Sequence, residues 1–319
     1  MRRVVAMLRW LPYPAVLVGA MALAVALLTH GVKPELVSVS AFVFALAVVF
    51  GLEWVIPLSP PPRAGTVLSD SVYLLMAAAV QRVVVGALTA LWLGLTVWVG
   101  GAMASPEQGS LPSRVLAGVS ALLLADFVKY WLHRLSHERP ALWRFHAAHH
   151  APRRVYSFNG VRIHPVNLGW NLAADTLAAL ALGLDATTFA LVASFRSVVA
   201  VLQHADLDVD LRGIDKLLST PNLHRFHHST AIAEGNTNYG STFIVWDTLF
   251  GTRFLRQGAP RAIGLANGQW HPDRFLATLV WPWQKGPSTA VLTRHGQPGS
   301  TAAGARGKRR GVSFLSSSR

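Results

Sequence analysis

The fold follows from residues 114–150, RVLAGVSALLLADFVKYWLHRLSHERPALWRFHAAHH, where an apolar run leads directly into five histidines. The run from Arg114 to Leu132 is close to the length that crosses the hydrocarbon core of a bilayer, about 20 residues. His133 follows this run at once, and His137 comes one helical turn later. We therefore expect a membrane helix that carries a histidine cluster where it leaves the bilayer.

Further apolar blocks lie on both sides of this stretch. The chain is 52% hydrophobic and only 14% charged, whereas about a quarter of the residues of a soluble domain are charged. Residues 11–28 and 36–58 each match one crossing. Because the second block follows so closely, we interpret the first as a retained membrane helix and not as a cleaved signal peptide. Within residues 70–103, Gln81 and Arg82 interrupt the apolar run, so we expect an interfacial lead-in followed by a third crossing.

The second half of the chain contains a divided apolar segment. Gly183 and Asp185 split residues 166–202 into two pieces at the short limit for spanning a bilayer. We expect a re-entrant or short hairpin that returns His204 to the side of the earlier histidines. The predicted fold class is an all-α integral membrane protein with about four transmembrane helices, this hairpin, and a cytoplasmic helical cap formed by residues 206–283.

The placement of basic residues predicts the orientation in the membrane. Residues 133–164 contain six arginines and the single acid Glu138, and arginine is enriched in cytoplasmic loops. We expect this segment and both termini in the cytoplasm, in a multi-pass protein of the cell inner membrane. The net charge of +14 would then face anionic lipid headgroups, and no nucleic-acid partner is expected. Asp175 and Arg196, inside the hairpin, should face protein because a charge facing lipid is costly.

Ten of the thirteen histidines lie between residues 133 and 228. Residues three and four positions apart share one face of a helix, so each cluster can present two or three imidazoles to a common point. The remaining histidines have no such neighbours, and we interpret His30, His271 and His295 as ordinary hydrogen-bonding residues. The clustered ones are His133 and His137, then His146, His149 and His150, then His164, His204, and finally His224, His227 and His228.

This number of imidazoles indicates a site for two metal ions. Coordination keeps crowded histidines neutral, and eight to ten histidines exceed the four ligands of one tetrahedral zinc. Imidazole suits iron, copper, nickel and zinc, so the residue type leaves the metal open. The sequence has no cysteine, no Glu-x-x-His spacing at the clusters and no His-Glu-x-x-His. These absences argue against thiolate zinc sites, soluble carboxylate di-iron sites and helical zinc proteases.

The order of the clusters is similar to that of a known family. Three histidine boxes follow a membrane helix, with His164-Pro165 and Gln203-His204 between the second and third. Asn-Tyr-Gly at 238–240 then precedes Trp-Asp-Thr-Leu-Phe-Gly-Thr at 246–252. Over residues 70–255 this pattern resembles the fatty acid hydroxylase and sterol desaturase superfamily, and most nearly the branch that contains alkylglycerol monooxygenase and bacterial sterol desaturase family proteins.

The resemblance implies a membrane-bound, non-haem di-iron oxygenase that uses dioxygen to hydroxylate or desaturate a lipid of the fatty acyl, sterol or alkyl-ether class. It implies three regions: N-terminal membrane helices (1–69), a membrane and catalytic domain (70–283), and a basic tail (284–319) whose composition predicts disorder. Some relatives carry a second histidine where this chain has Ala200. The implied metal ligands are His133, His137, His146, His149, His150, His164, His204, His224, His227 and His228.

Electrons for such a reaction would come from a separate reductase or ferredoxin. The sequence has no cysteine for an iron–sulfur cluster and no dinucleotide-binding Gly-x-Gly-x-x-Gly. Two rival functions use the same ligands. In a histidine-rich metal transporter we would expect ligands inside the spans, whereas most lie just outside them. A membrane metallohydrolase would need neither dioxygen nor electrons, so oxygen consumption separates it from an oxygenase.

The residues between the boxes leave two interpretations open. Asn238 and Asp247 could orient an imidazole through its outer nitrogen, or they could cap a turn, as these residue types often do. Trp143, Phe145 and Phe226 lie among the histidines. They could exclude water from the site, but we favour ordinary aromatic packing.

Overall fold

The computed structural model describes residues 9–60, 64–98, 109–211, 213–267 and 269–284. These residues form helices and connecting loops, and the β-structure among them is confined to isolated bridges. The long helices are α2 (Pro12–Thr29), α3 (Pro34–Val55), α4 (Ala64–Trp98), α5 (Leu111–Glu138), α7 (Pro165–Ala181) and α8 (Ala186–Gln203). The short ones are α6 (Pro140–His150), η1 (Ser157–Val161), η2 (Ile214–Lys216), α9 (Pro221–His227), α10 (Ile232–Gly235), α11 (Val245–Leu249), α12 (Phe275–Val280) and η3 (Trp281–Trp283). The predicted all-α fold is confirmed.

Prolines mark where many of these helices begin. Proline occupies one of the first two positions of α2, α3, α5, α6, α7 and α9. A first-turn proline costs nothing there, because the first N–H groups of a helix have no intrahelical acceptor. Pro140 and Pro221 therefore fix the starts of the two helices that carry the His-x-x-His-His boxes.

Among the described residues, five helices are long and apolar enough to cross a membrane: α2, α3, α4, α5 and α8. The expected lead-in and third crossing form one continuous helix, because α4 runs without interruption for 35 residues. Gln81 and Arg82 are good helix formers and neither removes a backbone hydrogen bond, so they change the polarity of the helix but not its continuity. At about 1.5 Å per residue α4 is about 52 Å long, well beyond the hydrocarbon core of about 30 Å.

The expected hairpin is present as α7 and α8. Gly183 lies in the connecting turn with a φ of 62°, a left-handed backbone conformation that glycine adopts without strain. Asp185 then caps α8 by accepting a hydrogen bond from the Thr188 N–H at 2.8 Å. α7 has 17 residues, and α8 has the length and composition of a full crossing.

Buried charges pair with one another between α5, α7 and α8. The Asp175 carboxylate forms ion pairs with Lys129 and Arg196, whose side chains are 9% exposed. The expectation that Asp175 and Arg196 face protein is confirmed. Pairing reduces the cost of charge at a depth where water cannot solvate it.

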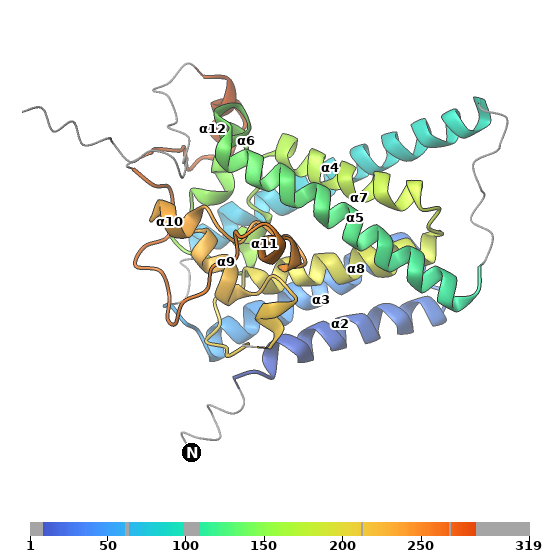
Figure 1. The fold of residues 1–319 in the computed structure, drawn as a ribbon, viewed down its shortest axis with the longest axis horizontal. Coiled ribbons are helices and arrows are strands. Elements are labelled where there is room, and N and C mark those ends of the chain that lie inside the picture. The colour runs from blue at the N-terminus through green and yellow to red at the C-terminus, as the bar shows by residue number, and fades with distance from the viewer. Residues whose placement is uncertain (1–8, 61–63, 99–108, 212, 268, 285–319) are drawn as a thin grey trace, which may run out of the picture.

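The chain returns repeatedly to one end of the helical bundle. Arg9, just before α2, forms an ion pair with Asp208, which follows α8. Pro57, just after α3, forms an antiparallel bridge with Leu207. Figure 1 shows the long helices side by side and the short helices α6, α9 and α10 gathered toward their left end. His204, at the end of α8, therefore lies on the side of the earlier histidines, as expected. Residues 285–319, which are all but the first residue of the predicted disordered tail, lie outside the described residues, as do the arginines at positions 2 and 3.

Candidate metal centre

Nine buried or half-buried histidines form two groups at this end of the bundle. Within each group the candidate ligand nitrogens lie within 4.8 Å of one another. The two groups adjoin, because the rings of His150 and His228 stack with centroids 4.4 Å apart. The first group consists of His133, His137, His146, His150 and His227, and the second of His149, His204, His224 and His228.

Each His-x-x-His-His box is divided between the two groups. His146 and His150 belong to the first group, and His149 between them belongs to the second. In the other box, His224 and His228 belong to the second group and His227 to the first. Each box therefore presents two of its imidazoles to one group, within the expected two or three, and its third imidazole to the other group. Residues four apart differ by about 40° around a helix, whereas neighbours differ by about 100°, so adjacent histidines diverge.

The first group is oriented through the outer nitrogens of its rings. His133 Nδ1 lies 2.7 Å from the Tyr239 carbonyl oxygen, and His227 Nδ1 lies 2.8 Å from the Thr237 carbonyl oxygen. Side-chain amides orient two more rings of this group: Asn167 Oδ1 is 2.8 Å from His146 Nδ1, and Asn236 Oδ1 is 3.2 Å from His137 Nδ1. Each oxygen accepts the Nδ1 proton and leaves Nε2 free, which fixes the tautomer and the direction of the ring.

The second group is centred on His204. Its Nε2 lies 3.3 Å from His149 Nε2 and 3.0 Å from His224 Nε2, and His228 Nε2 lies 3.0 Å from His224 Nε2. His204 Nδ1 donates to the Ala200 carbonyl oxygen in its own helix, at 2.8 Å. The helices α6, α8 and α9 thus each contribute a ring nitrogen to one small volume.

The nitrogens of both groups fit transition-metal coordination. Two imidazole nitrogens, each about 2.1 Å from a shared metal ion, are about 3.0 to 3.4 Å apart for right-angled to tetrahedral geometry. The Nε2–Nε2 distances of the second group, and the 3.1 Å between His146 and His150, match this range. The Nε2 atoms of His133, His137 and His227 are buried with no hydrogen-bond partner among the described residues. A buried polar nitrogen without a partner is costly, and a metal ion would satisfy it.

Burial keeps these imidazoles in the neutral form that binds metal. Desolvation lowers the pKa of His146 and of His204 to about 4. It also lowers the pKa of His149, His224 and His228, and neighbouring imidazoles add to the effect by electrostatic repulsion. A neutral imidazole has a lone pair to donate, so no proton has to leave before a metal binds.

His164, the tenth expected ligand, lies outside both groups. Its Nδ1 accepts a hydrogen bond from the Val166 N–H at 3.2 Å, which caps α7, and its Nε2 donates to the Leu279 carbonyl oxygen at 3.1 Å. Both nitrogens are therefore used by the backbone. The histidine that precedes Pro165 starts a helix, a role that its place in the motif does not reveal.

The isolated histidines also lie outside the two groups. His30 caps the end of α2 through a contact of its Nδ1 with the Ala26 carbonyl oxygen at 2.8 Å. His271 is buried in the cap with its ring against Trp281, centroids 4.6 Å apart. Position 295 lies outside the described residues.

Asn238 and Asp247 hold turns and do not contact an imidazole directly. Asp247 accepts hydrogen bonds from the backbone N–H groups of Tyr239 and Gly240, at 2.8 and 2.7 Å. Asn238, which has a φ of 55°, donates to the carbonyl oxygens of Leu223 and Phe254. The turn-capping interpretation is confirmed. Asp247 nevertheless fixes the residue whose carbonyl oxygen accepts from His133. The amides that do contact clustered histidines belong to Asn167 and Asn236, and no motif in the sequence pointed to these two residues.

The aromatic residues near the boxes have two different environments. The Trp143 ring lies against His137 and His150, with centroids 5.2 and 5.4 Å apart, and covers the first group. Phe145 packs on His164, and Phe226 packs on Phe254. All three aromatic side chains pack against other rings, which is the favoured interpretation.

Fold and site together define a helical protein with membrane-length helices and two adjoining histidine groups that could hold metal ions. Residues 118–252 match the model of the fatty acid hydroxylase family, a stretch that contains all nine clustered histidines. This part of the chain is thus similar to the fatty acid hydroxylase family, in agreement with the resemblance of its histidine boxes.

Three curated relatives illustrate the family. The chain is 34% identical to ornithine lipid hydroxylase OlsE of Rhizobium tropici over 180 residues, which cover 56% of this chain and 53% of the relative. It is 29% identical to human alkylglycerol monooxygenase over 135 residues, 42% of this chain and 29% of the relative. It is 26% identical to methylsterol monooxygenase 2-2 of Arabidopsis thaliana over 132 residues, 41% of this chain and 49% of the relative. The matches thus span about half or less of each relative, and no solved structure matches the chain significantly.

Proposed function

We propose that this chain is a di-iron oxygenase that hydroxylates or desaturates a membrane lipid. The observation that carries the proposal is the pair of adjoining groups of neutral, buried imidazoles at one end of a bundle of membrane-length helices. The names of its relatives, which are hydroxylases and monooxygenases, support the same reaction class. His164 is left out of the proposed ligand set, because both its nitrogens bond to the backbone.

Iron is the proposed metal because the resemblance of the histidine boxes implies a di-iron oxygenase. Imidazole binds several transition metals, but zinc does not change oxidation state and cannot supply dioxygen chemistry. Two iron ions in these groups would supply the activation of dioxygen, as co-substrate, and the attack on an unactivated C–H bond. The nine histidines, without a carboxylate in either group, are the proposed donors.

The protein itself orients the ligands and excludes water. Four rings of the first group are fixed by hydrogen bonds to oxygen, and the Trp143 ring lies against His137 and His150 of the same group. A dry pocket protects a reactive centre from side reactions. Two electrons per turnover would come from a separate reductase or ferredoxin, since the sequence has neither cysteine nor a dinucleotide-binding glycine motif.

A lipid substrate is proposed from the position of the site and from the relatives. The names of the relatives refer to an ornithine lipid, an alkylglycerol and a methylsterol, all of them lipids. His133 and His137 lie in the last two turns of α5, a helix of membrane length. A lipid chain could therefore reach the centre sideways from the bilayer. The proposed classes remain fatty acyl, sterol and alkyl-ether lipids.

The proposed orientation places the centre and both termini in the cytoplasm, in the cell inner membrane. The basis is the excess of arginine in residues 133–164. A reporter fused after Arg319 tests this orientation. We expect fluorescence from a fluorescent protein that folds in the cytoplasm. Activity of alkaline phosphatase, which folds only in the periplasm, would overturn the proposed orientation.

Lipid analysis with purified protein tests the function. The chain would be loaded with ferrous iron without oxygen, then supplied with a chemical or ferredoxin-based reductant, dioxygen and membrane lipid. We expect a lipid that gains one oxygen atom or loses two hydrogens, together with oxygen consumption. A hydrolysed lipid without oxygen consumption would indicate a metallohydrolase, and metal flux into vesicles without lipid change would indicate a transporter; either result would overturn the proposal.

A further inference from the structure

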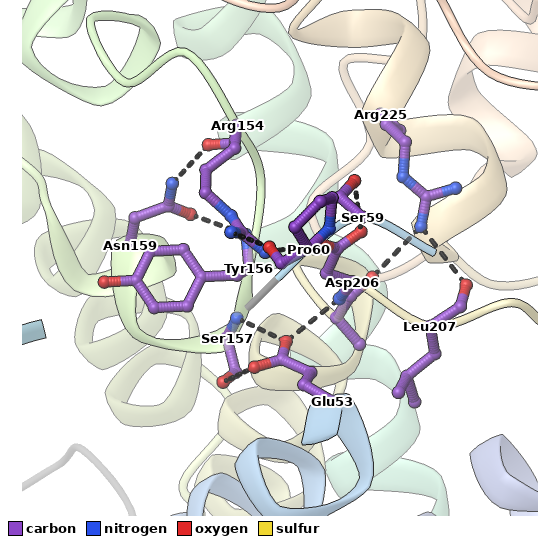
Figure 2. Close-up of polar contacts among 11 residues, drawn as sticks. Glu53, Ser59, Pro60, Arg154, Tyr156, Ser157, Asn159, Asp206, Leu207 and Arg225 are labelled. Carbon is purple, nitrogen blue, oxygen red and sulfur yellow. Dashed lines mark hydrogen bonds and ion pairs between the residues drawn. The ribbon is translucent and has the colours of Figure 1, made fainter. Parts of the chain in front are cut away.

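Glu53 is a buried carboxylate in the last turn of the membrane helix α3. Its side chain belongs to neither histidine group, and the residue is only 2% exposed. It accepts three hydrogen bonds: from the Ser157 N–H and hydroxyl, each at 2.8 Å, and from the Asp206 N–H at 2.9 Å. Figure 2 shows Glu53 hydrogen-bonded to both Ser157 and Asp206, which belong to two separate segments of the chain. Burying a carboxylate is costly unless such bonds satisfy it, so these contacts hold their partners firmly.

The two segments that Glu53 joins lie on either side of the metal-facing residue His204. Asp206 follows His204 by two positions. Ser157 is the first residue of η1, and Gly160 in the same turn lies directly on the His204 ring. A Cβ atom at Gly160 would be 2.9 Å from both Cγ and Nδ1 of that ring, closer than atoms can approach without displacement. Glu53, Ser157 and Asp206, here called the Glu53 cluster, thus fix both flanks of His204.

Further polar contacts extend the Glu53 cluster to the neighbouring helix. The Asp206 carboxylate accepts from Arg154 at 2.6 Å and from the Ser59 hydroxyl at 3.2 Å. Arg225, next to His224 in α9, donates to the carbonyl oxygens of Ala205 and Leu207, at 3.1 and 3.4 Å (Figure 2). The end of α8, which carries His204, and the helix α9, which carries His224, are therefore both tied to the backbone segment of residues 205–207.

The second group depends on such packing more than the first. The Nδ1 atoms of His149 and His224 are buried and have no hydrogen-bond partner among the described residues. By contrast, four rings of the first group donate to an oxygen. His204 touches both His149 and His224 through Nε2, so a shift of its ring alters the whole second group.

We propose that Glu53 is a positioning residue for the metal ion of the second group, acting through η1 and Gly160 to aim the His204 imidazole. This inference rests on the proposed metal function of the two groups. Loss of the carboxylate releases η1 and the backbone at Asp206, and the His204 ring then loses the surface that holds it. The first group, oriented by its own hydrogen bonds, keeps its metal.

Two substitutions test the proposal by different routes. Glu53→Gln keeps the shape but turns an NH₂ group toward N–H donors, and Gly160→Ala pushes the ring without touching the carboxylate. Gly160 has no positive φ, so alanine is compatible with its backbone. Glu35→Gln, exposed in the first turn of α3, and Gly169→Ala, where the nearest atom to a new Cβ is 3.9 Å away, are matched controls.

The measurements are iron per chain after titration against a chelator, the Mössbauer spectrum of iron-loaded protein, and the melting temperature in detergent. Glu53→Gln and Gly160→Ala should each retain one iron and bind the other about 10- to 100-fold more weakly. Their Mössbauer spectra should resemble that of His204→Ala. Both controls should bind two irons as the unmodified chain does.

Three results would count against these ideas, and they are distinguishable. Two irons bound with unchanged affinity in both test variants would overturn the positioning role. Equal loss of both irons, in proportion to a lower melting temperature, would also overturn it, because it would show a merely structural role. Failure of the unmodified chain to bind two metal ions would instead overturn the proposed function, and the inference would fall with it.

Discussion

The hydrogen bond between Asn167 and His146 offers a direct test of how the first group is oriented. Asn167 is 3% exposed and His146 is 5% exposed, so water has no access to replace a lost partner. Their contact is 2.8 Å long. Asn167→Ala would leave the buried Nδ1 proton without an acceptor, at a cost of about 1–3 kcal/mol. This matches the 10- to 100-fold loss, about 1.4 to 2.8 kcal/mol, typical when an outer partner of a metal-bound histidine is removed.

Competition between the protein and a chelator of known affinity measures this loss. Asn167→Asp should retain metal affinity, because a carboxylate oxygen can accept the same proton. Asn171→Ala, one turn later in α7 and half-buried, is the control for changing an amide in this helix. If Asn167→Ala binds metal as tightly as the unmodified chain, the outer hydrogen bonds do not orient the ligands, and the argument for the first group fails.

Three further predictions concern the ligands, acid stability and the buried charges. His227→Ala should abolish lipid oxidation and lower metal content while the protein stays folded, whereas His30→Ala, at an exposed helix end, should leave turnover unchanged; mass spectrometry and elemental analysis measure both. In metal-free protein, burial lowers the pKa of His146 and His204 from 6.5 to about 4, so the unfolded chain binds more protons between these values. Stability should therefore be complete above about pH 6.5 and decline as the pH falls toward 4, which melting curves in detergent would reveal; a flat profile would contradict the burial of neutral imidazoles. Asp175→Ala should destabilise the bundle, by up to about 3–5 kcal/mol, because Lys129 and Arg196 lose their ion-pair partner and keep, among the described residues, only the buried Asp126 as a nearby counter-charge. An unchanged melting temperature would show that Asp126 alone is sufficient.

The sequence alone was sufficient for the class of fold and for all nine histidines of the two groups, while the tenth predicted ligand, His164, lies outside them. Apolar runs of membrane length, prolines at helix starts and a glycine at the hairpin turn act locally, so their consequences can be inferred without knowing the rest of the chain. The polarity of residues 70–103 suggested a lead-in and a crossing, and the structure shows that both belong to the continuous helix α4. Gln81 and Arg82 change what surrounds a helix, but only loss of backbone hydrogen bonds interrupts it.

Tertiary structure decided how the ligands are shared. Helical periodicity brings His146 and His150 to one face and sends His149 to another, but only the positions of α5, α8 and α9 show which group each face meets. It also decided that His164 caps α7 and lies outside both groups. A histidine ring has the same chemistry in either role, so the difference depends on whether a backbone donor or another imidazole is nearby.

The residues that orient the ligands could be found only in three dimensions. Asn167 is 21 residues away in the sequence from its hydrogen-bond partner His146, and Glu53 is 104 residues away from its partner Ser157. A side-chain amide or carboxylate acts through hydrogen bonds of defined length and direction, and no spacing rule links such partners along the chain. The sequence by itself therefore determined a helical membrane protein with clustered imidazoles. The packing of distant segments decided which imidazoles meet and what holds them, because those contacts depend on distance in space and not on separation in sequence.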